Sequence, residues 1–241
     1  MVELELDRTT YPTFRDAVIA AEASGDAAPQ PPRSYPGYPR VELVRVRPRW
    51  WPSLDRILAR RRSVRRLGTR QPSRKQLSRL LQTSHGITGS YWAGPVPSAG
   101  GLQALELYLV PLESGWLAPG AYHYDRQGHS LARVVAEAPR PRWADLVPSL
   151  GLVEGGALLW VLVGDVGRVR RKYGERSLRF LLQESGHLMQ NLCLASAGLG
   201  LATVPMGGYL ERAIARELVL PETDVVLYAG VAGDGFQRGE P

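Results

Sequence analysis

The sequence from Arg171 to Tyr209 reads RKYGERSLRFLLQESGHLMQNLCLASAGLGLATVPMGGY. Its middle carries the longest uninterrupted helical pattern in the chain, because apolar residues from Phe180 to Leu199 leave little polar surface. A helix that is apolar on nearly every side is expected to be buried on most sides. We expect Gly198 and Gly200 to end this helix, since glycine adopts the left-handed cap conformation at low cost.

Polar residues and a turn in this stretch allow a binding site as well as a plain core. Glu184, His187 and Asn191 recur at steps of three and four residues, so they share one helix face. The turn Pro205–Gly208 lets another molecule approach the backbone closely, because its two glycines carry no side chain. A buried helix that leads into a Gly-rich loop is typical of proteins that hold a flat cofactor, and equally of an ordinary core.

The composition indicates a chain that can bury a large core. It has 241 residues, 44% of them hydrophobic, which fits one large domain or two small ones. The net charge is +7, and arginine supplies nearly all of the positive charge, since Lys75 and Lys172 are the only lysines. The guanidinium fork suits phosphates and carboxylates, so nucleic acid and a phosphorylated cofactor are both candidate ligands. An arginine-rich proteome would also produce this excess.

The cysteine count and the hydropathy exclude several classes of protein. Cys193 is the only cysteine, which excludes an intrachain disulfide and a cysteine zinc site, and no His/Cys/Asp cluster has metal-ligand spacing. The first ten residues show no secretion signal pattern, and no apolar run approaches the roughly 20 residues of a membrane span. We therefore expect a soluble cytoplasmic protein without a metal site.

Proline content divides the chain into two parts. Residues 1–52 are a Pro-rich N-terminal extension, with one short helix expected over 14–23, that we expect to pack on the surface of a domain spanning 53–241. In that domain the patterns predict helices and strands that do not strictly alternate, which indicates an α+β fold. The helices are expected over 54–61, after a cap at Ser73, over 139–148 and over 209–218, and the strands over 102–110, 120–124, 130–135, 157–164 and 224–231.

Three short motifs carry possible chemistry, and each has a structural alternative. Arg61, Arg62 and Arg65 with Ser63 could converge on one phosphate, lie on nucleic acid or form a solvated face. The loop Pro97–Gly101 offers backbone amides to the edge of a planar ring, or is an ordinary connection. Lys172–Tyr173 could move protons, or could be a solvated lysine beside a packed phenol.

The order of these motifs resembles the nitroreductase-like flavoproteins and, within them, the SagB-type dehydrogenases. The order is RRSVRRL, PSAGGLQALELYL, the GAYHYD hairpin, RKYGER…ESGHLMQNL and GLGLATVPMGGY, and it covers about residues 53 to 235. The resemblance implies a central, mainly antiparallel sheet flanked by helices, with a long buried helix at the interface of a homodimer. It also implies FMN bound at that interface.

The resemblance assigns a role to each motif. In such proteins an arginine-serine motif holds the FMN phosphate, here Arg61, Arg62, Ser63 and Arg65. A Pro-Ser loop, commonly from the partner subunit, contacts the flavin ring, here Pro97, Ser98, Ala99 and Gly100. A second loop lies along the isoalloxazine, here Pro205, Met206, Gly207 and Gly208. A late basic residue on the phosphate would be Arg238, and a catalytic pair that acts on azolines would be Lys172 and Tyr173.

The resemblance implies an FMN-dependent dehydrogenase that oxidises an azoline-like heterocycle in a modified peptide or natural product, beside a possible biosynthetic partner enzyme. The alternatives are an NAD(P)H-dependent nitro or quinone reductase, and a non-catalytic basic module or flavin-fold partner protein. We expect neither membrane nor nucleic-acid binding. Three departures from the family pattern bear on the substrate. Gly101 replaces asparagine, Gln103-Ala104 replaces Tyr-Pro, and Leu67 replaces phenylalanine.

Overall fold

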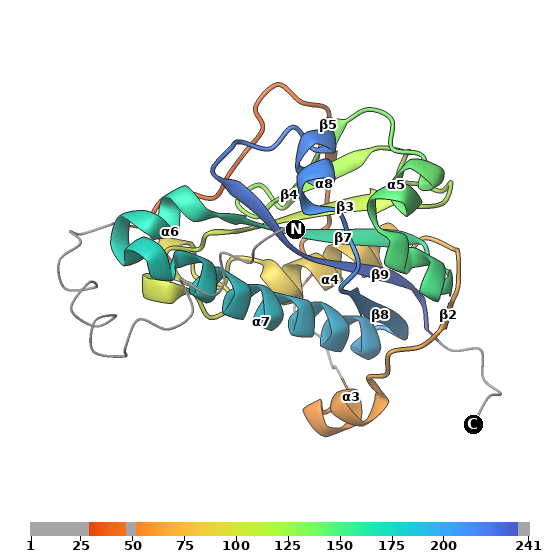
Figure 1. Cartoon of the computed structure of the whole chain (residues 1–241). Helices are drawn as coiled ribbons and strands as arrows, with labels where there is room; N and C mark the ends of the chain where they lie inside the picture. Colours follow the sequence, from red (N-terminus) through yellow and green to blue (C-terminus); the bar gives the residue numbers. More distant parts are fainter. Residues whose placement is uncertain (1–28, 47–51, 236–241) are drawn as a thin grey trace.

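A seven-stranded sheet, in the order β1-β5-β4-β3-β7-β9-β8, lies at the centre of the protein, and every neighbouring pair in it is antiparallel (Figure 1). The structure, a computed structural model, describes residues 29–46 and 52–235. The strands are β1 (Arg40–Glu42), β3 (Leu105–Pro111), β4 (Ala121–Asp125), β5 (Ser130–Val135), β7 (Leu158–Asp165), β8 (Leu201–Met206) and β9 (Asp224–Asp234). A separate parallel pair joins β2 (Arg66–Leu67) and β6 (Glu154–Gly155).

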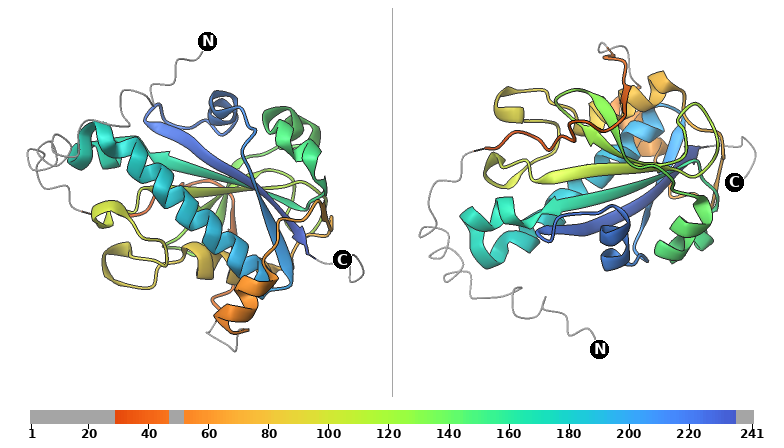
Figure 2. Two further views of the ribbon diagram at one scale, coloured as in Figure 1. Left: turned by 60° about the horizontal axis from the view of Figure 1, so that its bottom comes forward. Right: turned by 90° about the horizontal axis from the view of Figure 1, so that it is seen from above.

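Helices cover both faces of the sheet and make a three-layer molecule (Figures 1 and 2). On one face lie α4 (Arg74–His85), α6 (Val166–Tyr173) and α7 (Ser177–Gly198), with α3 (Leu54–Arg60) near the end of α7. On the other lie α5 (Arg140–Leu146), the turn η3 (Pro148–Leu152) and α8 (Glu211–Glu217). Shorter 3-10 turns are η1 (Ser90–Trp92), η2 (Ala99–Gly101) and η4 (Gly174–Arg176). The predicted α+β class with a mainly antiparallel sheet is confirmed.

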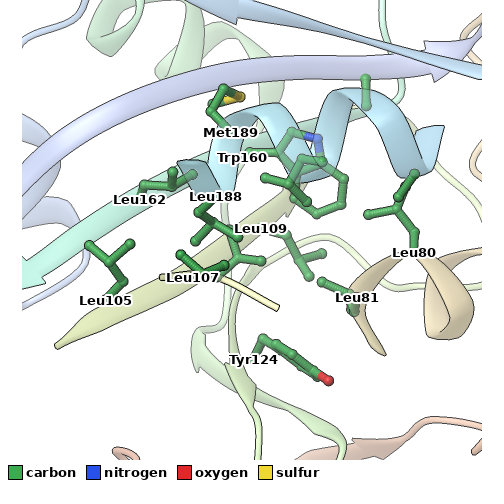
Figure 3. Packing of buried hydrophobic residues seen from close by; sticks show 14 of the residues in the cluster. Leu80, Leu81, Leu105, Leu107, Leu109, Tyr124, Trp160, Leu162, Leu188 and Met189 are labelled. Atoms are coloured by element: carbon green, nitrogen blue, oxygen red, sulfur yellow. The ribbon is translucent and has the colours of Figure 1, made fainter. Parts of the chain in front are cut away.

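The larger of the two hydrophobic cores lies between the sheet and the helices α4 and α7 (Figure 3). Leu107 and Leu109 of β3 point into it from one strand, because alternate residues of a strand share a face. Trp160 of β7 is fully buried in the same cluster, which also contains Leu188 of α7 and Leu80 of α4. The continuous apolar run of β7 follows from burial on both faces of a central strand.

The long helix α7 buries one face and leaves the other exposed within a single chain. Leu181, Leu188 and Leu192 are fully buried, whereas Leu182 is 40% exposed. The exposed face also carries Gln183, Gly186, His187 and Gln190. The prediction of burial on most sides therefore fails for the single chain, because the sheet covers only one side of the helix. Placement of this helix at a dimer interface stays a prediction.

The described part of the N-terminal extension, residues 29–46, is integrated into the sheet rather than only laid over the surface. Its strand β1 pairs with β5 and forms one edge of the sheet. The Arg33 guanidinium donates to both carboxylate oxygens of Asp224, with Nη2 at 3.0 Å from Oδ1. The hydroxyls of Tyr35 and Tyr108 lie 2.6 Å apart. The helix expected over 14–23 lies outside the described residues.

Two further boundaries differ from those expected. The apolar run after α7 forms the edge strand β8, which includes Pro205 and Met206 of the expected loop. Proline is tolerated there because an edge strand needs fewer backbone donors than a central one. Strand β9 continues three residues past the expected end at Val231, because its C-terminal half pairs with β8 on one side and β7 on the other.

Candidate functional site

A cavity of about 450 Å³ lies where the arginine run meets the end of α7 and the start of β8. Helix α3, capped by Ser53, delivers Arg60, Arg61 and Arg62 to one wall. Small residues make up much of the rest of the lining, among them Ala197, Gly200 and Ala202. Figure 2 (left) shows α3 beside this end of α7. The cavity therefore combines guanidinium groups with walls that leave room for a ligand.

The charge at this cavity is uncompensated within the described part of the chain. No ion pair joins Arg61 or Arg62 to a carboxylate of residues 29–46 or 52–235, whereas the neighbouring Arg66 pairs with Glu154 at 3.2 Å. Burial raises the pKa of the Cys193 thiol to about 11, an effect that Arg61 opposes, so this cavity-lining thiol is neutral at pH 7. A cluster of arginines without acidic partners is a fitting donor set for a phosphate group.

Only part of the predicted phosphate motif reaches the cavity. Arg61, Arg62 and Val64 line it, while Ser63 and Arg65 are exposed and do not. The chain is not helical after α3, and alternate residues of an extended segment point to opposite sides. Arg65 instead uses its carbonyl oxygen to accept the Glu154 N–H at 2.8 Å. The predicted Arg238 lies outside the described residues.

The Pro205–Gly208 corner is connected to the cavity by strand β8. Thr203 lines the cavity, and Gly207 follows four residues later, about 13 Å along an extended strand. Gly208 is fixed by Ser149, whose backbone N–H and hydroxyl both donate to the Gly208 carbonyl oxygen, at 3.2 and 2.8 Å. Gly207 is exposed, and an added Cβ there would meet nothing within 4 Å. The corner is thus rigid on one side and open on the other.

A buried acid of α7 holds the Pro97–Gly100 loop through hydrogen bonds. Glu184 is 4% exposed, and its Oε1 accepts the Ala99 N–H at 2.6 Å and the Ser98 hydroxyl at 3.3 Å. Burial raises the pKa of Glu184 to about 6, an effect that these two donors oppose. The expectation that this loop offers free amides to a ring is therefore wrong for Ala99, whose N–H is already bonded.

The same loop meets the Lys172–Tyr173 pair, which ends helix α6. Gly100 has a φ of +58°, and a Cβ added to it would lie 2.6 Å from Tyr173 Oη and 2.8 Å from Lys172 Nζ. The ammonium group of Lys172 lies 5.7 Å from the centroid of the Tyr173 ring. Two motifs that are more than 70 residues apart in the sequence, the loop and the pair, therefore form one cluster.

Gln103, a departure from the family pattern, anchors the far end of this loop. Its N–H donates to Ser98 Oγ at 2.8 Å, and its carbonyl oxygen accepts from Arg168 Nη1 at 3.0 Å. Its side-chain oxygen accepts from Arg126 Nη2 at 3.1 Å. The sequence did not predict that Gln103 and Glu184 hold the loop. It marked Glu184 only as one of three polar residues on a face of the long helix, and Gln103 only as a departure from the family pattern.

The cavity and the loop cluster lie toward opposite ends of α7. Glu184 contacts the loop, and Ala197 lines the cavity thirteen residues later, about 20 Å along a helix. One chain therefore does not bring the Pro97–Gly100 loop to its own arginine cavity. Within the described residues, no group of three His, Cys, Asp or Glu side chains is placed to hold a metal ion. None of the helices among them is long and apolar enough to cross a membrane.

Comparison with known proteins adds to this geometry. The family model for the Nitroreductase family matches residues 58–234, which include the end of α3, the loop cluster, α7 and β8. The chain belongs to the nitroreductase family. Members of this family are oxidoreductases that typically bind a flavin. The arginine cavity and the open Pro205–Gly208 corner, joined by β8, fit an elongated ligand with a phosphate at one end.

Individual relatives agree with this assignment. A protein of Methanocaldococcus jannaschii named as a nitroreductase is 29% identical over 72% of this nitroreductase-family chain and 88% of its own length. A protein of Ralstonia eutropha assigned as a nitroreductase has a crystal structure similar to 89% of the chain and 98% of its own, with a TM-score of 0.71 and 23% identity.

Two further solved structures share the fold. One is assigned as a nitroreductase from Exiguobacterium sibiricum in complex with FMN, similar over 79% of the present chain and 91% of its own, with a TM-score of 0.56 and 16% identity. The other is the E. coli microcin synthetase McbBCD complex with truncated pro-MccB17 bound. One chain of it is similar over 98% of the present chain and 99% of its own, with a TM-score of 0.64 and 19% identity. At these identities the likeness shows the fold alone.

Proposed function

We propose that this chain is an FMN-dependent dehydrogenase of the SagB type, which oxidises an azoline-like heterocycle in a modified peptide or natural product to the azole. The observation that carries the proposal is the contact of Lys172 and Tyr173 with the 97–101 loop at Gly100. A lysine and a phenol at a loop that contacts a flavin ring form a proton-transfer site beside the redox centre. The chain also shares its fold with one chain of the microcin synthetase McbBCD complex, which was solved with truncated pro-MccB17 bound.

We assign FMN binding to the cavity and the corner described above. Arg61 and Arg62 would hold the phosphate, and Pro205–Gly208 would lie along the ring, because β8 connects the two. FMN, when bound, supplies the two-electron acceptor that no side chain of the protein provides. The protein contributes binding, orientation and proton transfer.

A homodimer would complete this site. The 97–101 loop lies about 20 Å along α7 from the arginine cavity of its own chain, so the loop would come from the partner subunit. The exposed face of α7, with Leu182 40% exposed, offers a surface for an isologous contact. Size-exclusion chromatography with light scattering tests this directly, and a monomer with tightly bound FMN would contradict it.

Proton transfer is the chain's own part in the reaction. Oxidation of an azoline to an azole removes two hydrogens, one as a hydride that carries both electrons and the other as a proton. Lys172 Nζ and Tyr173 Oη both lie against Gly100, so either is placed to accept that proton, Lys172 as the neutral amine or Tyr173 as the phenolate. Dioxygen would accept the electrons in the final step and restore the oxidised cofactor.

The visible absorption spectrum of the purified protein is the first test, since a bound flavin colours the protein yellow and a protein without flavin is colourless. The second test is turnover of an azoline-containing peptide by the wild type, by Lys172→Ala/Tyr173→Phe and by the control Lys75→Ala on α4. The double variant is expected to retain FMN and lose turnover. Equal turnover by the wild type and the double variant would refute the assignment.

An NAD(P)H-dependent nitro or quinone reductase is the second candidate. It is favoured by the relative from M. jannaschii, which is named as a nitroreductase. It uses the same FMN site but needs no proton-transfer pair. Rapid oxidation of NADPH with a nitroaromatic acceptor, unchanged in the double variant, would select this function over the dehydrogenase.

A further inference from the structure

Glu184 is a buried acid that the proposed reaction does not use. It belongs to α7, is 4% exposed, and forms no ion pair with any residue in the described part of the chain. A buried carboxylate is unfavourable unless hydrogen bonds or a cation compensate for the lost water. Its Oε1 receives two such bonds, from the Ala99 N–H at 2.6 Å and the Ser98 hydroxyl at 3.3 Å. The loop donors therefore compensate part of the cost of burying this charge.

The other side of the same loop supports the Lys172–Tyr173 pair. Gly100 follows Ala99 directly, and the position of its missing Cβ is 2.6 Å from Tyr173 Oη and 2.8 Å from Lys172 Nζ. The two side-chain ends thus pack on the backbone next to the amide that Glu184 fixes. A shift of Ala99 would move the surface on which both functional groups rest.

We propose that Glu184 is a positioning residue, which fixes the 98–100 backbone and thereby sets where Lys172 Nζ and Tyr173 Oη stand. The inference rests on the proposed function only in that the pair acts in the reaction. Glu184 itself touches neither atom, and acts through the loop. A carboxylate is suited to this because one oxygen accepts two donors at once, and charge-assisted bonds are the stronger kind.

The first experiment needs neither FMN nor substrate. With only two lysines in the chain, ¹³Cε-lysine labelling gives two NMR signals, which Lys75→Arg assigns. In Glu184→Ala the Lys172 signal is expected to move while that of Lys75 stays. Hydrogen exchange of the Ala99 amide is expected to rise about tenfold or more, since it loses a charge-assisted bond. Glu184→Gln keeps a side-chain oxygen as acceptor and is expected to stay near the wild type in both measurements.

The second experiment measures turnover. The kcat of Glu184→Ala is expected to fall about tenfold, with recovery in Glu184→Gln, whereas Glu175→Ala, which removes an exposed acid of η4, is expected to match the wild type. An unmoved Lys172 signal in Glu184→Ala, or unchanged kcat despite a moved signal, would overturn the proposal. A wild type that turns over no azoline would refute the proposed function, while the lysine signal still decides whether Glu184 positions the pair.

Discussion

Replacing Glu184 with glutamine should stabilise the protein at neutral pH. The pKa of this buried carboxyl group is about 6, against an ordinary value of 4.5. A raised pKa means that the folded state binds the proton more tightly than the unfolded state does. Since one pKa unit corresponds to about 1.4 kcal/mol, the ionised carboxylate lowers the free energy of unfolding by about 2 kcal/mol once the pH is well above the folded-state pKa.

The destabilisation by Glu184 depends on pH, because only the ionised carboxylate is unfavourable in the folded state. Below the unfolded-state pKa of 4.5 the group is protonated in both states, and no penalty exists. The penalty grows as the pH rises through the interval from 4.5 to about 6, and is complete above it. Glutamine is neutral throughout. The difference in unfolding free energy between Glu184→Gln and the wild type should therefore shift in favour of the variant by about 1.5 kcal/mol from roughly pH 4.5 to roughly pH 7.5.

Urea denaturation at a series of pH values measures this difference. The other titrating groups act equally in both proteins and cancel when the two curves are subtracted. Glu175→Gln, at an acid whose side chain is 72% exposed, is the matched control and should show no such rise. A flat difference for Glu184→Gln, or one that favours the wild type as the pH rises, would show that the Glu184 carboxylate is not destabilised in the folded protein.

Three other perturbations test separate parts of the structure. Arg33→Ala leaves the buried Asp224 carboxylate without its cation, so the free energy of unfolding measured in urea should fall by about 3 to 5 kcal/mol. Adding Asp224→Asn should recover part of this stability. A fall below about 1 kcal/mol would contradict the integration of residues 29–46 into the fold. Arg61→Ala should weaken FMN binding about 10- to 100-fold by fluorescence titration, and equal affinity would remove this arginine from the phosphate site. Gly100→Ala should lower turnover while FMN stays bound, because the new methyl group displaces Tyr173 Oη; unchanged turnover would show that the loop and the pair are independent.

The sequence by itself determined the local elements and the class of fold. Apolar periodicity predicted β7, the β4–β5 hairpin and the long helix α7. The spacing of apolar residues within one helix or strand is enough to predict whether one face of it or both are buried. Ser73 marked the start of α4 through a capping box that the structure shows, since capping involves only neighbouring residues. The order of five motifs was enough to place the chain among nitroreductase-like proteins.

Edge strands were harder to predict than central ones. The three-residue strand β1 and the proline-containing strand β8 lie at the two edges of the sheet. Strand β1 is too short and too exposed to show hydrophobic alternation, whereas β8 is largely buried but contains a proline, which in the sequence favours a turn. Their pairing with β5 and β9 is decided by the geometry of the completed sheet.

Only the tertiary structure decided which polar groups meet. Glu184 and Ala99 are 85 residues apart, and Arg33 and Asp224 are 191 apart, yet each pair is joined by a hydrogen bond. The sequence also grouped Ser63 with Arg61 and Arg62 on one phosphate, whereas the two arginines line the cavity and Ser63 does not. Periodicity reports which face of an element is buried, but the partner of a buried polar group depends on how separate elements pack, and no local pattern encodes that.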